Sequence, residues 1–307
     1  MIFGLAAGMF FSATFILNRA MSLEGGHWYW SAALRYAYLV ALLGAGISAV
    51  KGLAYFRRVL AELSRHWIFW IMSGSVGFGG FYALICFAAG HSPGWVVATT
   101  WQMTIIASLF VLRLFGRTFS RRIWLYCAVV FIGVVLVNIS QVDTKDDILS
   151  LLLGAIPVLV AAVLYPLGNQ LVWEAKHGRA GLPKVDADLL NNAFAKVFLL
   201  SVGSMPFWVV LFFFTAAASP SPGQYINVAL VALFSGVIAT SLFLSARNMA
   251  DNASKLAAVD ATQASEVLFA LAGEILILQA SLPNLIGLCG MLVACMGLVA
   301  LVRHEHD

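Results

Sequence analysis

Long apolar runs alternate with short polar segments along the whole chain. A helix needs about 20 apolar residues to cross the hydrocarbon core of a bilayer, and most of these runs approach that length. Pro93-Gly94 separates two runs, SPSPG at 219–223 separates two others, and Pro283 suits the first turn of the last run. The pattern predicts ten transmembrane helices, over residues 2–20, 28–50, 67–89, 94–114, 123–140, 149–172, 192–216, 226–248, 260–280 and 283–302.

Composition agrees with a membrane protein. Of the 307 residues, 62% are hydrophobic and 10% are charged, whereas soluble domains average about 25% charged residues. The mean hydropathy of +0.92 points the same way. The first residues, MIFGLAAGMFFSATF, have no basic segment before the apolar run, so they predict a first span rather than a signal peptide. We expect an all-α integral protein of the inner (plasma) membrane, in contact with the lipid bilayer.

Positive charges gather in alternate loops, and cytoplasmic loops are the ones enriched in Lys and Arg. The opposite loops hold only Arg19 and Lys145. Both termini are therefore expected to be cytoplasmic, and the net charge of +4 needs no nucleic-acid partner. The basic loops follow the second, fourth, sixth and eighth spans and hold Lys51, Arg57, Arg58, Arg65, Arg113, Arg117, Arg121, Arg122, Lys176, Arg179, Lys184, Arg247 and Lys255, with Arg303 in the C-terminal segment.

The two halves of the sequence resemble each other. The first span, GLAAGMFFSATFILNRAM, resembles the sixth, GAIPVLVAAVLYPLGNQLV, and the third resembles the eighth. This predicts five-helix repeats over 1–140 and 149–307, joined by a linker at 141–148. Because five is odd, the second repeat enters the membrane from the opposite side. Inverted repeats are typical of secondary transporters whose substrate site lies near the midplane between the halves.

Several segments in this order resemble the drug/metabolite transporter superfamily with its EamA-like inverted repeats. Gly273-Glu274 followed by Gly287 matches the frame of a typical repeat, while Gly116-Arg117 stands where the first repeat would have Gly-Glu. The segments FFSATFILNRAMSLEGGHWYWSAALRYAYLV, TTWQMTI and YPLGNQ resemble the bacterial multidrug resistance efflux transporters. The resemblance implies export of small organic compounds. Small exporters of this superfamily use an acid in their first helix, which this first span lacks.

Three acids stand in one apolar segment, although a charge at the bilayer centre costs about 2.5–3.5 kcal/mol on insertion scales. Asp260 with Gln263 has the spacing of a helix N-cap and its partner. Glu266 lies roughly 9 Å deeper, on the same stripe as Gln263. We interpret Glu266 as the acid that contacts substrate and couples to protons, with Asp260 as a second coupling candidate and Gln263 at the substrate. The alternative is a structural acid held by a basic partner. The resemblance implies that Glu274 braces the turn into the tenth span.

The fourth span carries a polar and aromatic group, Thr100, Trp101 and Gln102, about two turns inside. Trp101 is deeper than an interfacial residue, and aromatic faces bind organic cations. These three residues predict a wall of the substrate site, against the alternative of core packing. Further candidates for the lining of the site are Asn18, Tyr82, Tyr165 and Asn169.

Other features exclude or leave open several classes of function. The chain shows no phosphate loop, zinc motif or serine elbow, so we expect no enzyme activity, cofactor or metal. For Arg35 we favour a structural ion pair over anion binding. Small residues at Gly290, Ala294 and Gly297 suit a homodimer seam and packing inside one bundle equally well. The favoured function is export of small organic, cationic compounds by proton antiport; the alternatives are a metabolite exporter for amino acids or nucleobases and, less favoured, a membrane enzyme or lipid-handling protein.

Overall fold

Helices make up the regular structure of the chain. The computed structural model describes residues 1–142, 147–251 and 253–305, and these contain no strand. The helical elements are α1 (Ile2–Leu23), α2 (Trp28–Lys51), α3 (Leu53–Arg65), α4 (Trp67–Gly74), η1 (Ser75–Gly80), α5 (Phe81–Ala88), α6 (Gly94–Trp101), α7 (Met103–Leu114), α8 (Arg121–Ile139), α9 (Asp147–Lys176), α10 (Ala187–Leu190), α11 (Ala193–Gly203), α12 (Met205–Thr215), α13 (Pro222–Val231), η2 (Ala232–Ala239), α14 (Thr240–Asn248), α15 (Ala253–Ala261), η3 (Thr262–Ala264), α16 (Ser265–Ile277) and α17 (Leu285–Glu305).

Nine helical stretches of the described residues are long and apolar enough to cross a membrane. They correspond to nine of the ten predicted ranges. The range 260–280 is absent from the set, and there the 3₁₀ turn η3 separates α15 from α16. The hydroxyl of Thr262 donates to the carbonyl of Val259, and that of Ser265 donates to the carbonyl of Thr262. Such i−3 bonds accompany the tightened turn at this point.

Four further predicted spans contain irregular turns in the described residues, and one of them is the seventh, which breaks at Ser204 between α11 and α12. The third span contains the π-helical segment η1, and the eighth contains the π-helical segment η2. The fourth span breaks at Gln102, between α6 and α7. The polar helix α3, between the second and third spans, was not predicted from the sequence. Irregular helical turns of this kind occur often at functional sites.

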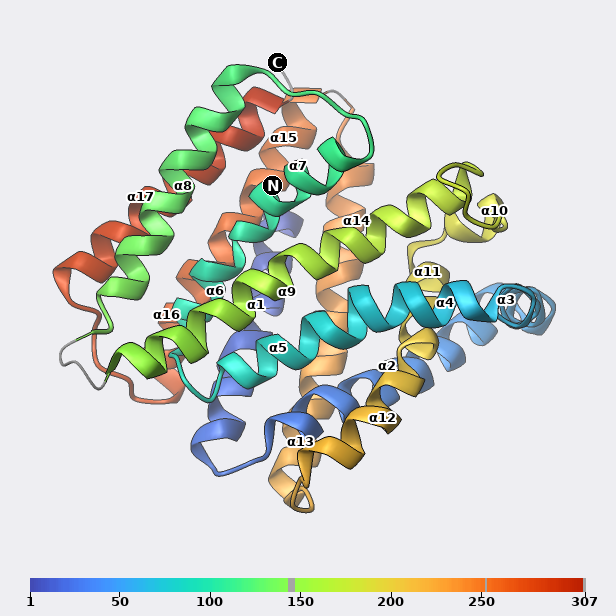
Figure 1. Cartoon of the computed structure of the whole chain (residues 1–307), viewed down its shortest axis with the longest axis horizontal. Coiled ribbons are helices and arrows are strands. Elements are labelled where there is room, and N and C mark those ends of the chain that lie inside the picture. Colours follow the sequence, from blue (N-terminus) through green and yellow to red (C-terminus); the bar gives the residue numbers. More distant parts are fainter. Residues whose placement is uncertain (143–146, 252, 306–307) are drawn as a thin grey trace.

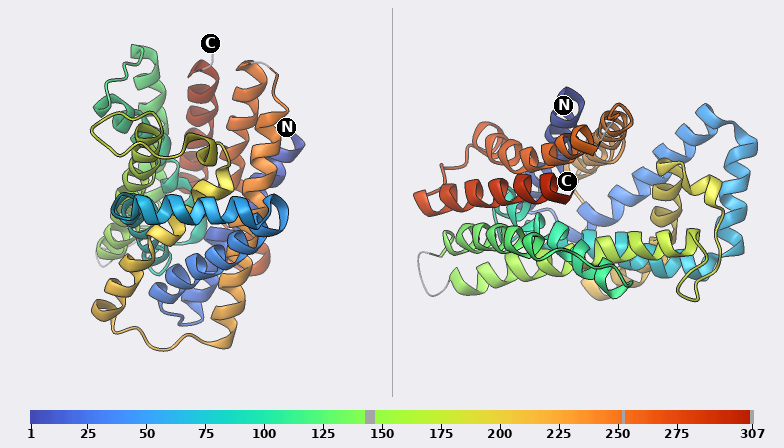
Figure 2. Two further views of the ribbon diagram at one scale, coloured as in Figure 1. Left: turned by 90° about the vertical axis from the view of Figure 1, so that its right-hand side faces the viewer. Right: turned by 90° about the horizontal axis from the view of Figure 1, so that it is seen from above.

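The bundle is organised around two long helices (Figures 1 and 2). Helix α1 packs along η2, α14 and α16, while α9 packs along η1, α5 and α7. Helices α8 and α17 form a separate antiparallel pair at one edge, and α2 packs against α11.

Glycines allow the closest helix crossings. Gly77 of η1 and Gly168 of α9 lie so close that a methyl group on either would collide with the Cα of the other. Gly8 of α1 lets this helix approach the start of α16, since a methyl group there would meet the side chain of Ser265. These two crossings bring η1 and α16 to the same interior space.

The predicted small-residue seam lies inside the chain. A methyl group on Gly290 or Gly297 would meet the backbone of α8, and one on Gly133 would meet the backbone of Ala294. This face of α17 therefore packs against α8, and a homodimer stays a prediction. Residues 143–146 of the predicted linker 141–148 lie outside the described part of the chain. They include Lys145, one of the two basic residues expected in the loops opposite the cytoplasmic ones.

Candidate functional site

A cavity of about 270 Å³ lies between the two halves of the chain. Its wall combines residues of α1, α2, η1, α5, α7, α9, α11, η2, α14, η3 and α16 with Trp101 at the end of α6. Trp101, Phe81 and Tyr165 form one aromatic group, in which ring centroids lie 5.0 Å (Phe81–Trp101), 5.0 Å (Phe81–Tyr165) and 5.6 Å (Trp101–Tyr165) apart. Further rings on the wall are Tyr36, Phe78 and Tyr82.

Two charged side chains of the described residues line this cavity. Glu266 stands in the first turn of α16, and only 8% of its surface is exposed. The break at η3 starts a new helix just before Glu266, so the positive end of the α16 dipole lies beside the carboxylate. Among the described residues, no hydrogen bond or ion pair holds Glu266. Its carboxylate is therefore available to a ligand or a proton.

The second charge is Arg35 of α2. Its guanidinium carbon lies 4.0 Å from the centre of the Tyr82 ring, and Nη2 donates to Ser235 Oγ at 3.1 Å. Its Nε is buried without a hydrogen-bond partner. No carboxylate of the described residues lies within 4.0 Å of Arg35. The structural ion pair that we expected for this residue is therefore wrong for the described chain.

The structure brings together five of the candidates predicted from the sequence. They come from five separate elements and border one cavity: Tyr82, Trp101, Tyr165, Gln263 and Glu266. Whether they bind substrate stays a prediction.

The remaining candidates point elsewhere. Thr100 is buried and accepts a hydrogen bond from Asn138 of α8 at 2.8 Å. Gln102 is buried and donates to the carbonyl of Ala98 in its own helix. Asn18 donates to the hydroxyl of Tyr82 at 3.0 Å, so it holds a cavity residue without lining the cavity itself.

Asp260 and Glu274 differ from their expected roles. Asp260 lies inside α15, which begins at Ala253, so it is not an N-cap; its carboxylate pairs with Arg247 of α14 at 3.0 Å. Glu274 does not brace the turn into the last helix. Its two carboxylate oxygens accept hydrogen bonds from the backbone N–H groups of Gly94 (2.7 Å) and Trp95 (3.0 Å), which fixes the start of α6.

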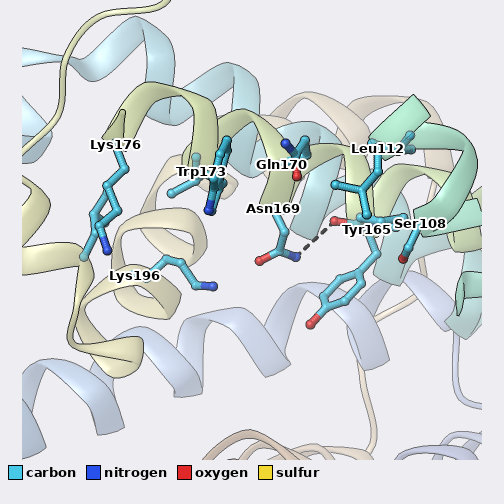
Figure 3. Close-up of a pocket in the computed structure, with 12 residues that line it drawn as sticks. Ser108, Leu112, Tyr165, Asn169, Gln170, Trp173, Lys176 and Lys196 are labelled. Atoms are coloured by element: carbon cyan, nitrogen blue, oxygen red, sulfur yellow. Dashed lines mark hydrogen bonds between the residues drawn. The ribbon is translucent and has the colours of Figure 1, made fainter. Parts of the chain in front are cut away.

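A second pocket, of about 440 Å³, meets the cavity at Tyr165, which borders both. Asn169 lies here, and its side chain donates to the carbonyl of Tyr165. Figure 3 shows Lys176 and Lys196 on the side of the pocket away from Tyr165, with Asn169 between the lysines and Tyr165. Both lysines flank the loop between α9 and α11.

Some wall residues could not be found from the sequence. Phe78 and Phe81 are ordinary apolar residues of a span, and Ser235 is one serine among many. Arg35 carried a signal, because a charge inside a span is rare, but the sequence pattern did not show that it borders the cavity.

Comparison with known proteins adds the family. The whole chain, residues 1–307, matches the EmrE family model, described as "Putative multidrug resistance efflux transporter". The chain belongs to this efflux transporter family. The resemblance to the drug/metabolite transporter superfamily seen in the sequence is thereby confirmed. Together with the apolar helices, membership implies a multi-pass membrane protein of a family that transports small compounds, and it argues against an enzyme.

Relatives of this efflux transporter include two curated bacterial proteins. "Uncharacterized protein YjlA" of Bacillus subtilis (strain 168) is 36% identical over 314 residues, which cover 97% of this chain and 92% of the relative. The "Uncharacterized 42.1 kDa protein in intracellular alkaline protease 3'region" of Shouchella clausii is 34% identical over 80% of this chain and 64% of the relative. A solved crystal structure aligns with a TM-score of 0.58 at 13% identity, over 98% of this chain and 97% of the other; this likeness concerns the fold alone.

Proposed function

We propose that this protein is a secondary active transporter that exports small organic compounds through alternating access, with the aromatic cavity as its substrate site and proton antiport at Glu266. One observation carries the proposal. Glu266 is a buried carboxyl group on the cavity wall, and no described residue holds it by a hydrogen bond or an ion pair. Intramembrane acids of this kind mark substrate and proton pathways.

Two inverted five-helix repeats in an inner (plasma) membrane, with ten spans and both termini cytoplasmic, form the framework of the proposal. The matching irregularities support it, since π-helical segments interrupt the third and eighth spans and breaks interrupt the fourth and ninth. In such transporters, broken helices meet at a midplane site. Trp101 stands just before one break, and Glu266 stands just after the other.

The coupling step exchanges one ligand of the carboxylate for another. An ammonium group of the substrate and a proton compete for Glu266, so protonation on one side of the membrane releases the substrate there. Arg35, Tyr36, Tyr82 and Tyr165 are the other charged or titratable residues on the described wall. Asp260 is a weaker candidate for coupling, because it is engaged by Arg247.

The test is Glu266→Gln in proteoliposomes of the purified full-length protein, assayed with a panel of organic cations and amino acids. The variant keeps the shape of the side chain and removes its proton chemistry. We expect loss of transport driven by a pH gradient, with exchange in the absence of a gradient partly retained. Glu24→Gln, at an exposed site outside the cavity, is the matched control.

Normal rate and normal pH dependence in Glu266→Gln would make Glu266 a structural acid and end the coupling proposal. If the Gln variant does not fold, Glu266→Asp retains the acid and shifts it by one methylene. The coupling proposal then requires that the Asp variant still responds to pH, with altered apparent affinity. An unaltered Asp variant contradicts it.

A further inference from the structure

The cavity places two opposite charges on its wall without joining them. Arg35 belongs to α2 and Glu266 to α16, and no described ion pair includes either residue. Arg35 has one buried N–H group, at Nε, with no acceptor. Arginine keeps its charge in proteins, and its planar fork of donors matches a carboxylate. Burying an unpaired charge is costly, so a ligand group that satisfies Arg35 is strongly favoured.

A ligand that carries only a positive charge complements Glu266 but not Arg35. Its ammonium group would meet Glu266, but it would enter a cavity of about 270 Å³ that already contains the Arg35 charge. Like charges repel inside a weakly polar cavity. A ligand that carries both a carboxylate and an ammonium group neutralises both residues at once.

The rest of the wall fits the body of a small molecule. The same wall carries the rings of Phe78, Phe81, Trp101 and Tyr165. They form an apolar surface against which a side chain can pack. The volume lies just below the range of about 300–1,000 Å³ that holds drug-sized ligands. This size favours a metabolite over a larger drug.

The adjoining pocket has the charge expected of an entrance for carboxylates. The charged residues on its described wall are Lys176 and Lys196. Lys176 donates to Asn191, and the ring of Trp173 lies 5.6 Å from the guanidinium carbon of Arg117 and 5.5 Å from that of Arg179. Charges of one sign in a hollow attract ligands of the other sign and raise their local concentration. A simple organic cation would be repelled at this entrance.

We infer that the substrate is a small zwitterion of the amino-acid type, whose carboxylate binds Arg35, whose ammonium group binds Glu266 and whose side chain packs among the aromatic rings. The inference rests on the proposed transport function of the same cavity. It assigns Arg35 as a specificity-determining residue, and it makes Lys176 and Lys196 part of the loading path from the loop between α9 and α11.

The experiment uses chemically blocked ligands on the full-length protein. The twenty common L-amino acids are screened for binding and for counterflow in proteoliposomes. Each one that binds is compared with its methyl ester, which lacks the anionic charge, and with its N-acetyl derivative, which lacks the cationic charge. We expect each blocked form to bind at least about tenfold more weakly, the usual loss when one charged hydrogen bond is removed.

Variants assign each blocked group to a residue. Arg35→Gln should abolish the preference for the amino acid over its methyl ester, and Glu266→Gln should abolish the preference over the N-acetyl derivative. Arg122→Gln, an exposed arginine on α8, should change neither ratio. The ligand series on the unaltered protein keeps the inference falsifiable if Arg35→Gln does not fold, and Arg35→Lys then tests the loss of the planar fork.

The outcomes separate the two proposals. If methyl esters or simple organic cations bind and are transported as well as the amino acids, the zwitterion inference is overturned while the transport function stands. The same holds if Arg35→Gln leaves the ester ratio unchanged. If neither amino acids nor organic cations are bound or moved by the unaltered protein, the proposed function itself fails.

Discussion

Trp101 is the residue whose position at the cavity depends most directly on helix geometry. It stands at the last position of α6, with Phe81 and Tyr165 against its ring. Its two neighbours in sequence, Thr100 and Gln102, point into protein contacts instead. Successive residues of a helix lie about 100° apart around the axis, so these three consecutive side chains point in different directions.

We expect Trp101→Ala to weaken substrate binding roughly five- to thirtyfold, the equivalent of about 1–2 kcal/mol for a lost aromatic face. Trp101→Phe should be milder, because a π face remains. Binding of the best compound from the transport panel is measured together with the yield of folded protein. Trp67→Ala, at an exposed position on α4, is the control. Equal losses of binding and yield in both Trp101 variants would indicate core packing.

The sequence could place several site residues but not their neighbours. Glu266, Trp101, Tyr165 and Tyr82 were found because polar or large aromatic groups deep in a span are rare, and each borders the cavity. Thr100 and Gln102 carried the same kind of signal and face away. The difference is the rotation of each helix about its axis, which packing decides and which the break at Gln102 changes.

At the scale of the helices, Glu274 connects two helices that carry cavity residues, although it does not line the cavity itself. Its carboxylate on α16 accepts hydrogen bonds from two N–H groups at the start of α6, those of Gly94 and Trp95. The first N–H groups of a helix have no partner within it, and the helix dipole favours a negative charge there. This contact ties the helix that bears Glu266 to the helix that bears Trp101.

We expect Glu274→Gln to destabilise the protein by about 1.5–3 kcal/mol, the usual contribution of a hydrogen bond to a charged group. The amide retains one acceptor and directs its NH₂ group at a backbone donor. Thermal unfolding in detergent measures the loss, with Glu24→Gln as the control at an exposed site. An unchanged midpoint for Glu274→Gln would show that the carboxylate does not hold α6.

The spans could be predicted from the sequence because length and hydropathy are properties of a single segment. The break at η3, the π-helical segments and the role of Glu274 could not, since each depends on contacts between segments. Gly8 admits α1 close to Ser265, and Gly77 admits η1 close to Gly168. The sequence shows these positions as glycines, but it does not identify the helix that packs against each of them.

At the scale of the whole molecule, helix contacts repeat when the two proposed halves are exchanged. Helix α1 packs on η2 and α16, and its proposed counterpart α9 packs on η1 and on α6 and α7. The last helices of the halves, α8 and α17, pair with each other. This exchange is what a two-fold axis in the membrane plane would produce. It supports the inverted repeat that the sequence halves predict.

The orientation of the bundle is tested by labelling cysteines from outside. In a background in which the four native cysteines are replaced, single cysteines at Ser64, Ser120 and Ser221 occupy exposed positions. The loops with Ser64 and Ser120 are rich in Lys and Arg, so we expect an impermeant thiol reagent on intact cells to label position 221 alone. Permeabilised cells should label all three, which shows that each thiol can react. Labelling at 64 or 120 in intact cells would reverse the orientation, and with it the direction in which the lysine-lined pocket loads substrate for export.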